Sequence, residues 1–135
     1  MKSVYLLFLA LILSSCSCSK EEKTYSPTEM WSIAQKADPS IVLVPITDPD
    51  KRILCQNYPG SGCIDGSGKR ILVSKVELLT IQYETVEQAR NAAFQIDQWY
   101  AGNWLFDDVT NEPVLESFVQ KVFDGKRPAL LIDSE

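Results

Sequence analysis

The chain has 135 residues, with 13 Lys and Arg, 18 Asp and Glu and no His, which gives a formal net charge of -5. This length predicts a single domain, and the lack of His excludes Ser-His-Asp and Cys-His catalytic arrangements as well as His-ligated zinc, iron and haem sites. The acidic balance argues against nucleic acid as a partner, because binding phosphates requires a surface rich in Lys and Arg.

A short basic start and an apolar run open the chain. Lys2 precedes an uninterrupted apolar run of ten residues, 4–13. A membrane-spanning helix needs about 20 such residues, so this run is too short to be an ordinary transmembrane segment. The combination predicts a signal peptide.

The apolar run ends in Leu13-Ser14-Ser15-Cys16, which resembles the lipobox of bacterial lipoproteins. The resemblance implies cleavage before Cys16, a diacylglycerol thioether on its sulfur and an acyl chain, such as palmitate, on its new amino group. Two or more acyl chains anchor a protein durably in a membrane. In Gram-negative lipoproteins the next residue helps to sort the protein, and Ser17, in place of Asp, implies the outer membrane.

This resemblance divides the chain into three parts. We expect residues 1–15 to be removed as a signal peptide and residues 16–25 to form a lipidated N-terminus and a polar tether. Residues 26–135 are then expected to form one globular domain that faces the periplasm. The mature chain is long enough to bury one hydrophobic core.

Three elements are predicted at the start of the domain. Ser26-Pro27-Thr28-Glu29 combines an N-cap Ser, a Pro at the first helical position and a Glu at the third, which is typical of a capping box. A helix should follow to about Ala37 and end before Asp38-Pro39. The β-branched run at 41–46 predicts a buried strand, and residues 52–55 favour a brief edge strand.

A loop rich in Pro and Gly follows, over residues 56–69. Cys55 and Cys63 lie eight residues apart around it, and the export route that the lipobox implies leads to an oxidising compartment. We therefore expect a disulfide between Cys55 and Cys63. Cys18 is then left free, paired between chains or otherwise modified.

The glycines of this loop do not match a nucleotide or calcium site. Gly62 and Gly68-Lys69 are one residue too far apart for a phosphate-binding loop, and Arg70 stands where Ser or Thr must bind magnesium. A calcium loop would need more Asp residues at alternating positions around Asp65, and a terminal Glu. We expect no nucleotide, no metal and no other cofactor.

The middle of the domain predicts a strand region followed by a helix. Residues 70–83 favour either one long bulged strand or a tight hairpin at Ser74-Lys75. Thr85 begins a second capping box, and the apolar stripe of the helix that follows extends to Tyr100. Gly102 then stands where a left-handed C-terminal cap belongs.

The predicted fold is α+β. Residues 104–109 favour a strand, which would complete a right-handed βαβ unit with parallel strands over about 76–109. A last helix should begin at Pro113 and close at Gly125, and residues 129–132 favour a small edge strand. We expect a sheet of three to five strands with helices packed on one face, similar in its C-terminal half to ferredoxin-like domains.

Three carboxylates cluster after the last long strand. Asp107, Asp108 and Glu112 lie close in sequence, and paired carboxylates can act as the acid and base of a glycosidase or hold a divalent ion. The same residue types are also favoured at the positive start of a helix, which here begins at Pro113. The cluster is therefore a candidate active site with a purely structural alternative.

Two aromatic residues are candidates for contacting a partner protein. Trp99 lies beside the Gly102 turn and Tyr58 lies in the 56–69 loop, and either could anchor a partner if its ring is exposed. The alternative for Trp99 is packing in the core.

The leading functional hypothesis is a non-enzymatic, lipid-anchored envelope protein whose domain binds another envelope component or stabilises an assembly. The alternative is a small hydrolase or ligand-binding enzyme that faces the periplasm and uses the acidic residues 107–112. A third hypothesis is an inhibitor that presents the loop 55–63 to a protease.

Overall fold

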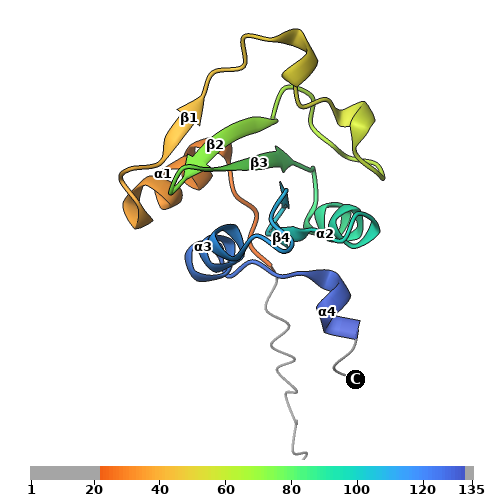
Figure 1. The fold of residues 1–135 in the computed structure, drawn as a ribbon. Coiled ribbons are helices and arrows are strands. Elements are labelled where there is room, and N and C mark those ends of the chain that lie inside the picture. Colours follow the sequence, from red (N-terminus) through yellow and green to blue (C-terminus); the bar gives the residue numbers. More distant parts are fainter. Residues whose placement is uncertain (1–21, 133–135) are drawn as a thin grey trace, which may run out of the picture.

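A five-stranded antiparallel sheet forms the centre of the fold, with the strand order β1-β2-β3-β5-β4 (Figure 1). The structure is a computed structural model, and it describes residues 22–132. The strands are β1 (Val42–Val44), β2 (Lys69–Val73), β3 (Val76–Gln82), β4 (Trp99–Ala101) and β5 (Trp104–Asp107). The helices are α1 (Pro27–Ala37), α2 (Val86–Gln95), α3 (Pro113–Phe123) and α4 (Pro128–Ile132), with short 3-10 helices η1 (Pro49–Lys51) and η2 (Cys55–Asn57). The predicted α+β class is confirmed.

Both predicted capping boxes are present. At the start of α1, the Ser26 hydroxyl accepts the Glu29 backbone N–H at 3.2 Å, and the Glu29 carboxylate accepts the Ser26 N–H at 2.8 Å. Thr85 and Gln88 make the same reciprocal pair at the start of α2. These local bonds satisfy backbone donors that a helix leaves unpaired, so the two helices begin where the sequence predicts.

β2 and β3 form a tight hairpin, which was one of the two predicted alternatives. Ser74 and Lys75 make the turn with φ values of 48° and 69°. A two-residue hairpin turn needs positive φ at both positions, because only then does its twist match that of the strands. The turn sets Val73 opposite Val76 and the rest of the register with them.

Two predictions for residues 41–55 are wrong. The strand predicted over 41–46 as buried is shorter and lies at the sheet edge, where Val42 and Leu43 are 54% and 47% exposed. Pro45 follows directly and has no N–H with which to continue the ladder. No strand forms at 52–55, because η1 ends at Lys51, η2 begins at Cys55 and the residues between them pair with no strand. η1 starts where the Asp48 carboxylate accepts the Asp50 N–H.

The predicted pair of parallel strands is also wrong. α2 ends at Gln95, and Asp97 takes a left-handed φ of 52° that turns the chain into the short strand β4. Gly102 therefore lies in the turn between β4 and β5 rather than at a helix end. β5 pairs antiparallel with both β3 and β4. The strands on either side of α2 run parallel but are separated by β5, and the likeness to ferredoxin-like domains is not confirmed.

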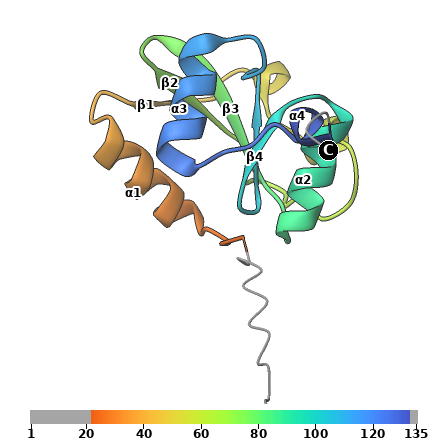
Figure 2. The same cartoon turned by 90° about the horizontal axis from the view of Figure 1, so that it is seen from below.

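Helices cover both faces of the sheet, which corrects the prediction of one covered face. In β5, Trp104 and Phe106 pack with α1 and α3, whereas Leu105 points to the other face and packs with α2. Figure 2 shows α1 beside α3, and α2 beside α4. The two faces thus carry separate hydrophobic clusters.

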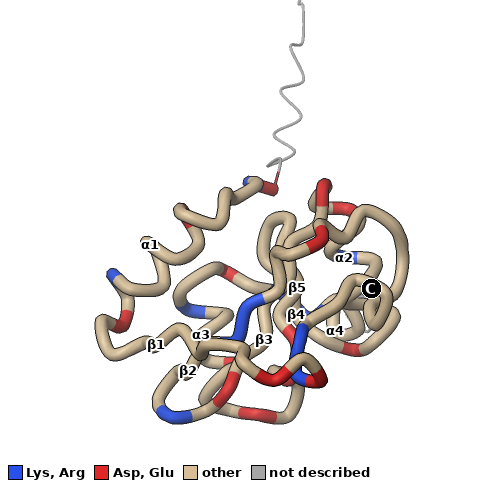
Figure 3. Tube along the Cα trace, turned by 90° about the horizontal axis from the view of Figure 1, so that it is seen from above, with Lys and Arg blue, Asp and Glu red and all other residues tan. Residues whose placement is uncertain are grey.

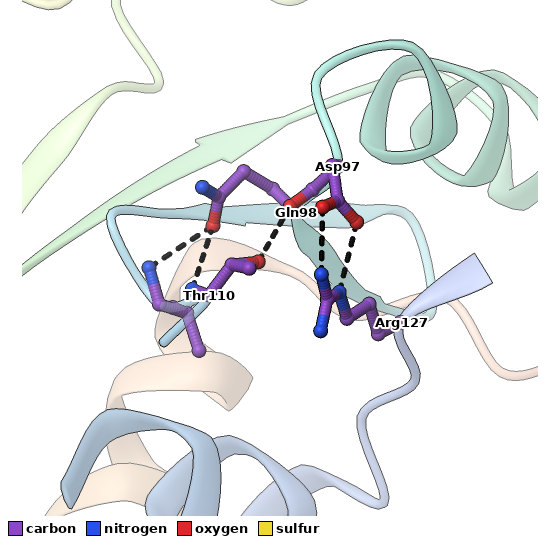
Figure 4. Close-up of polar contacts among 5 residues, drawn as sticks. Asp97, Gln98, Thr110 and Arg127 are labelled. Carbon is purple, nitrogen blue, oxygen red and sulfur yellow. Dashed lines mark hydrogen bonds and ion pairs between the residues drawn. The ribbon is translucent and has the colours of Figure 1, made fainter. Parts of the chain in front are cut away.

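Polar contacts tie the turn after α2 to the segments on either side of α3 (Figure 4). The Arg127 guanidinium donates to both carboxylate oxygens of Asp97, at 2.8 and 2.6 Å, and holds the pKa of Asp97 below its ordinary value. The side-chain oxygen of Gln98 accepts the backbone N–H groups of Val109 and Thr110, at 3.0 and 3.1 Å. These bonds fix the position of β4, whose short length gives it few ladder bonds of its own.

The end of the chain differs from its prediction. Residues 129–132 lie in α4 and not in an edge strand, and the free edge of β4 is taken by Lys126, which exchanges two backbone hydrogen bonds of 2.9 Å with Tyr100. The left-handed residue that ends α3 is Asp124, one position before Gly125. Within residues 22–132, none of the helices has the length and apolar character needed to cross a membrane.

Candidate functional site

An apolar cavity of about 350 Å³ lies between α1 and the sheet face that α3 also covers. This volume is within the range of small-molecule sites, roughly 300–1,000 Å³. α1, four strands, the end of α3 and the loop before β2 all contribute to the lining. The residues that face each other across it include Met30, Trp31 and Ala34 from α1, and Ile71, Thr80 and Phe106 from the sheet.

The N-terminal end of α1 is fastened to the β4–β5 hairpin through Tyr25. The Tyr25 N–H donates to the side-chain oxygen of Asn103 at 2.9 Å, and the Trp104 indole N–H donates to the Tyr25 carbonyl at 2.9 Å. Asn103 is buried and donates in turn to the Tyr83 carbonyl. Because Trp104 also lines the cavity, this attachment sets the distance between α1 and the sheet.

The other end of α1 is fixed by the return of the chain into β1. The Asp38 carboxylate accepts the Ser40 N–H at 3.0 Å, and Ile41 is buried beneath the helix end. Leu43 then pairs with Ile71 in the sheet, lines the cavity and is still 47% exposed. α1 is thus held at both ends, and the exposed Leu43 lies where the cavity meets solvent.

Two polar side chains of the lining, Ser67 and Trp104, are hydrogen-bonded within the protein. The Ser67 hydroxyl donates to the Ile64 carbonyl at 2.6 Å and accepts the Gln82 N–H at 3.0 Å. The Trp104 indole N–H is occupied by the Tyr25 carbonyl. Lys69 is exposed and carries the only charge among the described residues of the lining, although charged residues lie on many elements of the domain (Figure 3).

The lining offers mainly apolar contact, with the Lys69 amine and the Thr80 hydroxyl as its further polar groups. Within the described part of the chain, the lining contains no carboxylate and no thiol, and its one serine hydroxyl is bonded to the backbone. A small molecule in the cavity would bury apolar surface against Met30, Ile71 and Phe106. Such a site is suited to holding an apolar ligand.

The predicted disulfide is confirmed on the opposite face of the sheet. Cys55 and Cys63 are bonded, with Cα atoms 5.6 Å apart, and both pack against the cluster under α2. The loop that they close is also held by backbone and side-chain bonds, since the Tyr83 hydroxyl donates to the Pro59 carbonyl and the Glu84 N–H to the Gly62 carbonyl. The loop 55–63 is therefore held in place against the sheet by the disulfide and by these hydrogen bonds.

The two aromatic candidates have different positions. Trp99 is only 6% exposed and packs in the core beneath α3, which was the alternative to a partner contact, because it lies on β4 instead of ending α2. Tyr58 is half-buried, and its hydroxyl donates to the Asp107 carboxylate at 2.7 Å. Burial and this bond raise the pKa of Tyr58 far above its ordinary value. Its contact with a partner stays a prediction.

The acidic residues 107–112 are mainly engaged in holding the fold. Asp107 accepts the Tyr58 hydroxyl with one oxygen and the Asp108 N–H with the other, at 2.8 Å. Glu112 caps α3 by accepting the Val114 N–H. Burial, and then the charge of Asp107, raise the pKa of Asp108. Among residues 22–132, no group of three or more Asp, Glu, Cys or His side chains is arranged to hold a metal ion.

The cavity and the place of Lys69 beside it were not predicted from the sequence. The one available signal was strand alternation, which places the side chain of Lys69 on the same face as Ile71 and Val73.

Cys16, the predicted lipidation site, lies outside the described residues. Comparisons of the chain with family profiles, with curated proteins and with solved structures found no match. The geometry of the domain itself is therefore the basis for assigning a function.

Proposed function

We propose that the chain is a lipid-anchored protein of the bacterial cell envelope whose non-enzymatic domain binds an apolar ligand or an apolar segment of an envelope component. The observation that carries this proposal is the cavity between α1 and the sheet, whose lining is mostly apolar and whose serine and Trp104 polar groups are bonded within the protein. The domain thus offers a preformed place for apolar surface, as ligand sites generally do.

The anchor is supported by the sequence alone, through Lys2, the apolar run 4–13 and the lipobox at 13–16. Acyl chains on Cys16 would hold the domain close to a membrane, with the segment up to Tyr25 as the connection. Ser17 favours the periplasmic face of the outer membrane in a Gram-negative host. Mass spectrometry of the N-terminal peptide from the native host tests this part. We expect a peptide that begins at acylated Cys16, and an unmodified Cys16 would contradict the anchor.

The alternative, a hydrolase that uses residues 107–112, has less support. Asp107 is engaged by Tyr58 and by the backbone of Asp108, and Glu112 caps its own helix. A general acid and base need carboxylates that are free to exchange protons with a substrate. The raised pKa of Asp108 is accounted for by burial and by its neighbour Asp107.

Filling the cavity should weaken binding strongly and leave the fold intact. Ala34 is buried on the cavity side of α1, so Ala34→Phe places a ring in the cavity, whereas Ala37→Phe makes the same change at an exposed position of the same helix. We expect the neutral dye N-phenyl-1-naphthylamine to bind wild type and Ala37→Phe equally, and Ala34→Phe at least tenfold more weakly. Fluorescence titration of the mature chain carrying Cys16→Ser measures this.

Circular dichroism of the same samples provides the control for folding. Equal dye affinity in all three proteins would show that the cavity is not the binding site.

A further inference from the structure

We infer that the ligand of this cavity is a medium-chain fatty acid, with its acyl chain between α1 and the sheet and its carboxylate at Lys69. The inference rests on the proposed function and names its ligand class. Three observations carry it: the charge of the lining, the position of Lys69 and the size of the cavity.

The first observation is that Lys69 has no partner of its own. Arg70 is paired with Glu77, Arg127 with Asp97 and Lys126 with Glu22. Lys69 makes no ion pair or side-chain hydrogen bond with any residue in 22–132, and no acidic residue of that range lines the cavity beside it. A cation beside an apolar cavity is complementary to an amphiphile with an anionic head group.

The second observation is the register of β2. Lys69 pairs with Thr80, and alternation along β2 sets Lys69 and Ile71 on the face covered by α1. Ile71 is 5% exposed, whereas Lys69 is exposed at the end of the strand. The cavity therefore passes from an apolar interior at Ile71 to a charged rim at Lys69 within two residues.

The third observation is the volume of about 350 Å³. This volume lies near the lower end of the range for small-molecule sites, roughly 300–1,000 Å³, and suits a ligand the size of one medium-length acyl chain. A single Lys supplies one positive charge, which matches the single negative charge of a carboxylate.

Photo-crosslinking of the full-length protein in its host membranes tests the inference. The probes are dodecanoic acid and dodecanol, each carrying a diazirine at the same carbon of the chain. Trypsin should release residues 24–36, which contain Met30, Trp31 and Ala34, and mass spectrometry measures the label on that peptide.

We expect the acid to label this peptide at least fivefold more than the alcohol in wild type. Lys69→Gln should reduce labelling by the acid to the level of the alcohol, and Lys69→Arg should retain the preference. The matched control is Lys75→Gln, which removes the same charge at the far end of the hairpin and should change nothing.

The failures of the two proposals are distinguishable. Equal labelling by acid and alcohol in wild type, unaffected by Lys69→Gln, would overturn the fatty acid and leave the apolar site in place. Absence of label from residues 24–36 with both probes would overturn the proposed function as well.

Discussion

Replacing both Cys55 and Cys63 by Ala should lower the free energy of unfolding by about 2.5 kcal/mol. The bond closes a ring of sequence separation 8, and a crosslink of this length restricts the unfolded chain far more than the folded one. In the folded state the loop keeps its bonds from Tyr58 to Asp107 and from Tyr83 to Pro59, so the variant should still fold. Guanidinium unfolding of the mature chain measures the difference.

The reduced wild-type protein is the control for this experiment. Its stability should equal that of the double Ala variant, because both lack the crosslink and keep the loop contacts. A double variant as stable as the oxidised wild type would mean that the loop is already ordered in the unfolded chain, and the crosslink would then contribute nothing to stability.

Gly102→Ala should destabilise the domain by about 3 kcal/mol, through backbone strain and overpacking together. Gly102 has a φ of 54°, and a Cβ there would lie 2.2 Å from the Lys23 carbonyl oxygen and 2.7 Å from the Tyr25 ring. These contacts are relieved when the segment that fastens α1 to the sheet moves away from the β4–β5 turn. We therefore also expect weaker dye binding in the cavity, measured in the same titration as for Ala34→Phe.

Gly60→Ala is the control for Gly102→Ala, because it introduces backbone strain without steric overlap of the new Cβ. Gly60 has a φ of 78°, and a Cβ there meets no atom within 4 Å. The left-handed backbone alone should cost about 1–2 kcal/mol. If the two Ala variants lose equal stability and bind the dye equally, the contact between Gly102 and the Tyr25 segment does not position α1.

Local signals predicted the parts of the fold that local bonds determine. The capping boxes at Ser26 and Thr85 are complete within four residues of sequence, and both helices begin there. The Cys55–Cys63 bond likewise follows from two residues around one loop. In each case the decisive interaction lies within a few residues of the chain.

Strand pairing could not be predicted in the same way. Tyr100 continues the helical stripe of Ala89 and Ala93 in sequence, but it lies in β4, because Asp97 ends the helix and distant groups hold the strand. Those groups are Arg127 and the Val109 backbone, which no local pattern connects to β4. Long-range contacts therefore overrode the helical period.

The cavity could not be predicted from the sequence either. It depends on how far Asn103 and Trp104 hold Tyr25, and with it α1, from the sheet. Hydrophobic periodicity indicates that α1 has an apolar face but not how closely that face packs. Because Tyr25 is held at this distance, the apolar face of α1 and the apolar face of the sheet leave a space between them.

The most direct test of the binding site uses Met30 as a reporter. Met30 lines the cavity, and the only other methionine is Met1, so a chain labelled with 13C at the methionine methyl groups carries a single reporter within the domain. Titration with dodecanoate should shift the Met30 methyl signal until it saturates, in wild type and in Ala37→Phe but not in Ala34→Phe. A Met30 signal that stays unchanged up to the solubility limit of dodecanoate would contradict binding in this cavity.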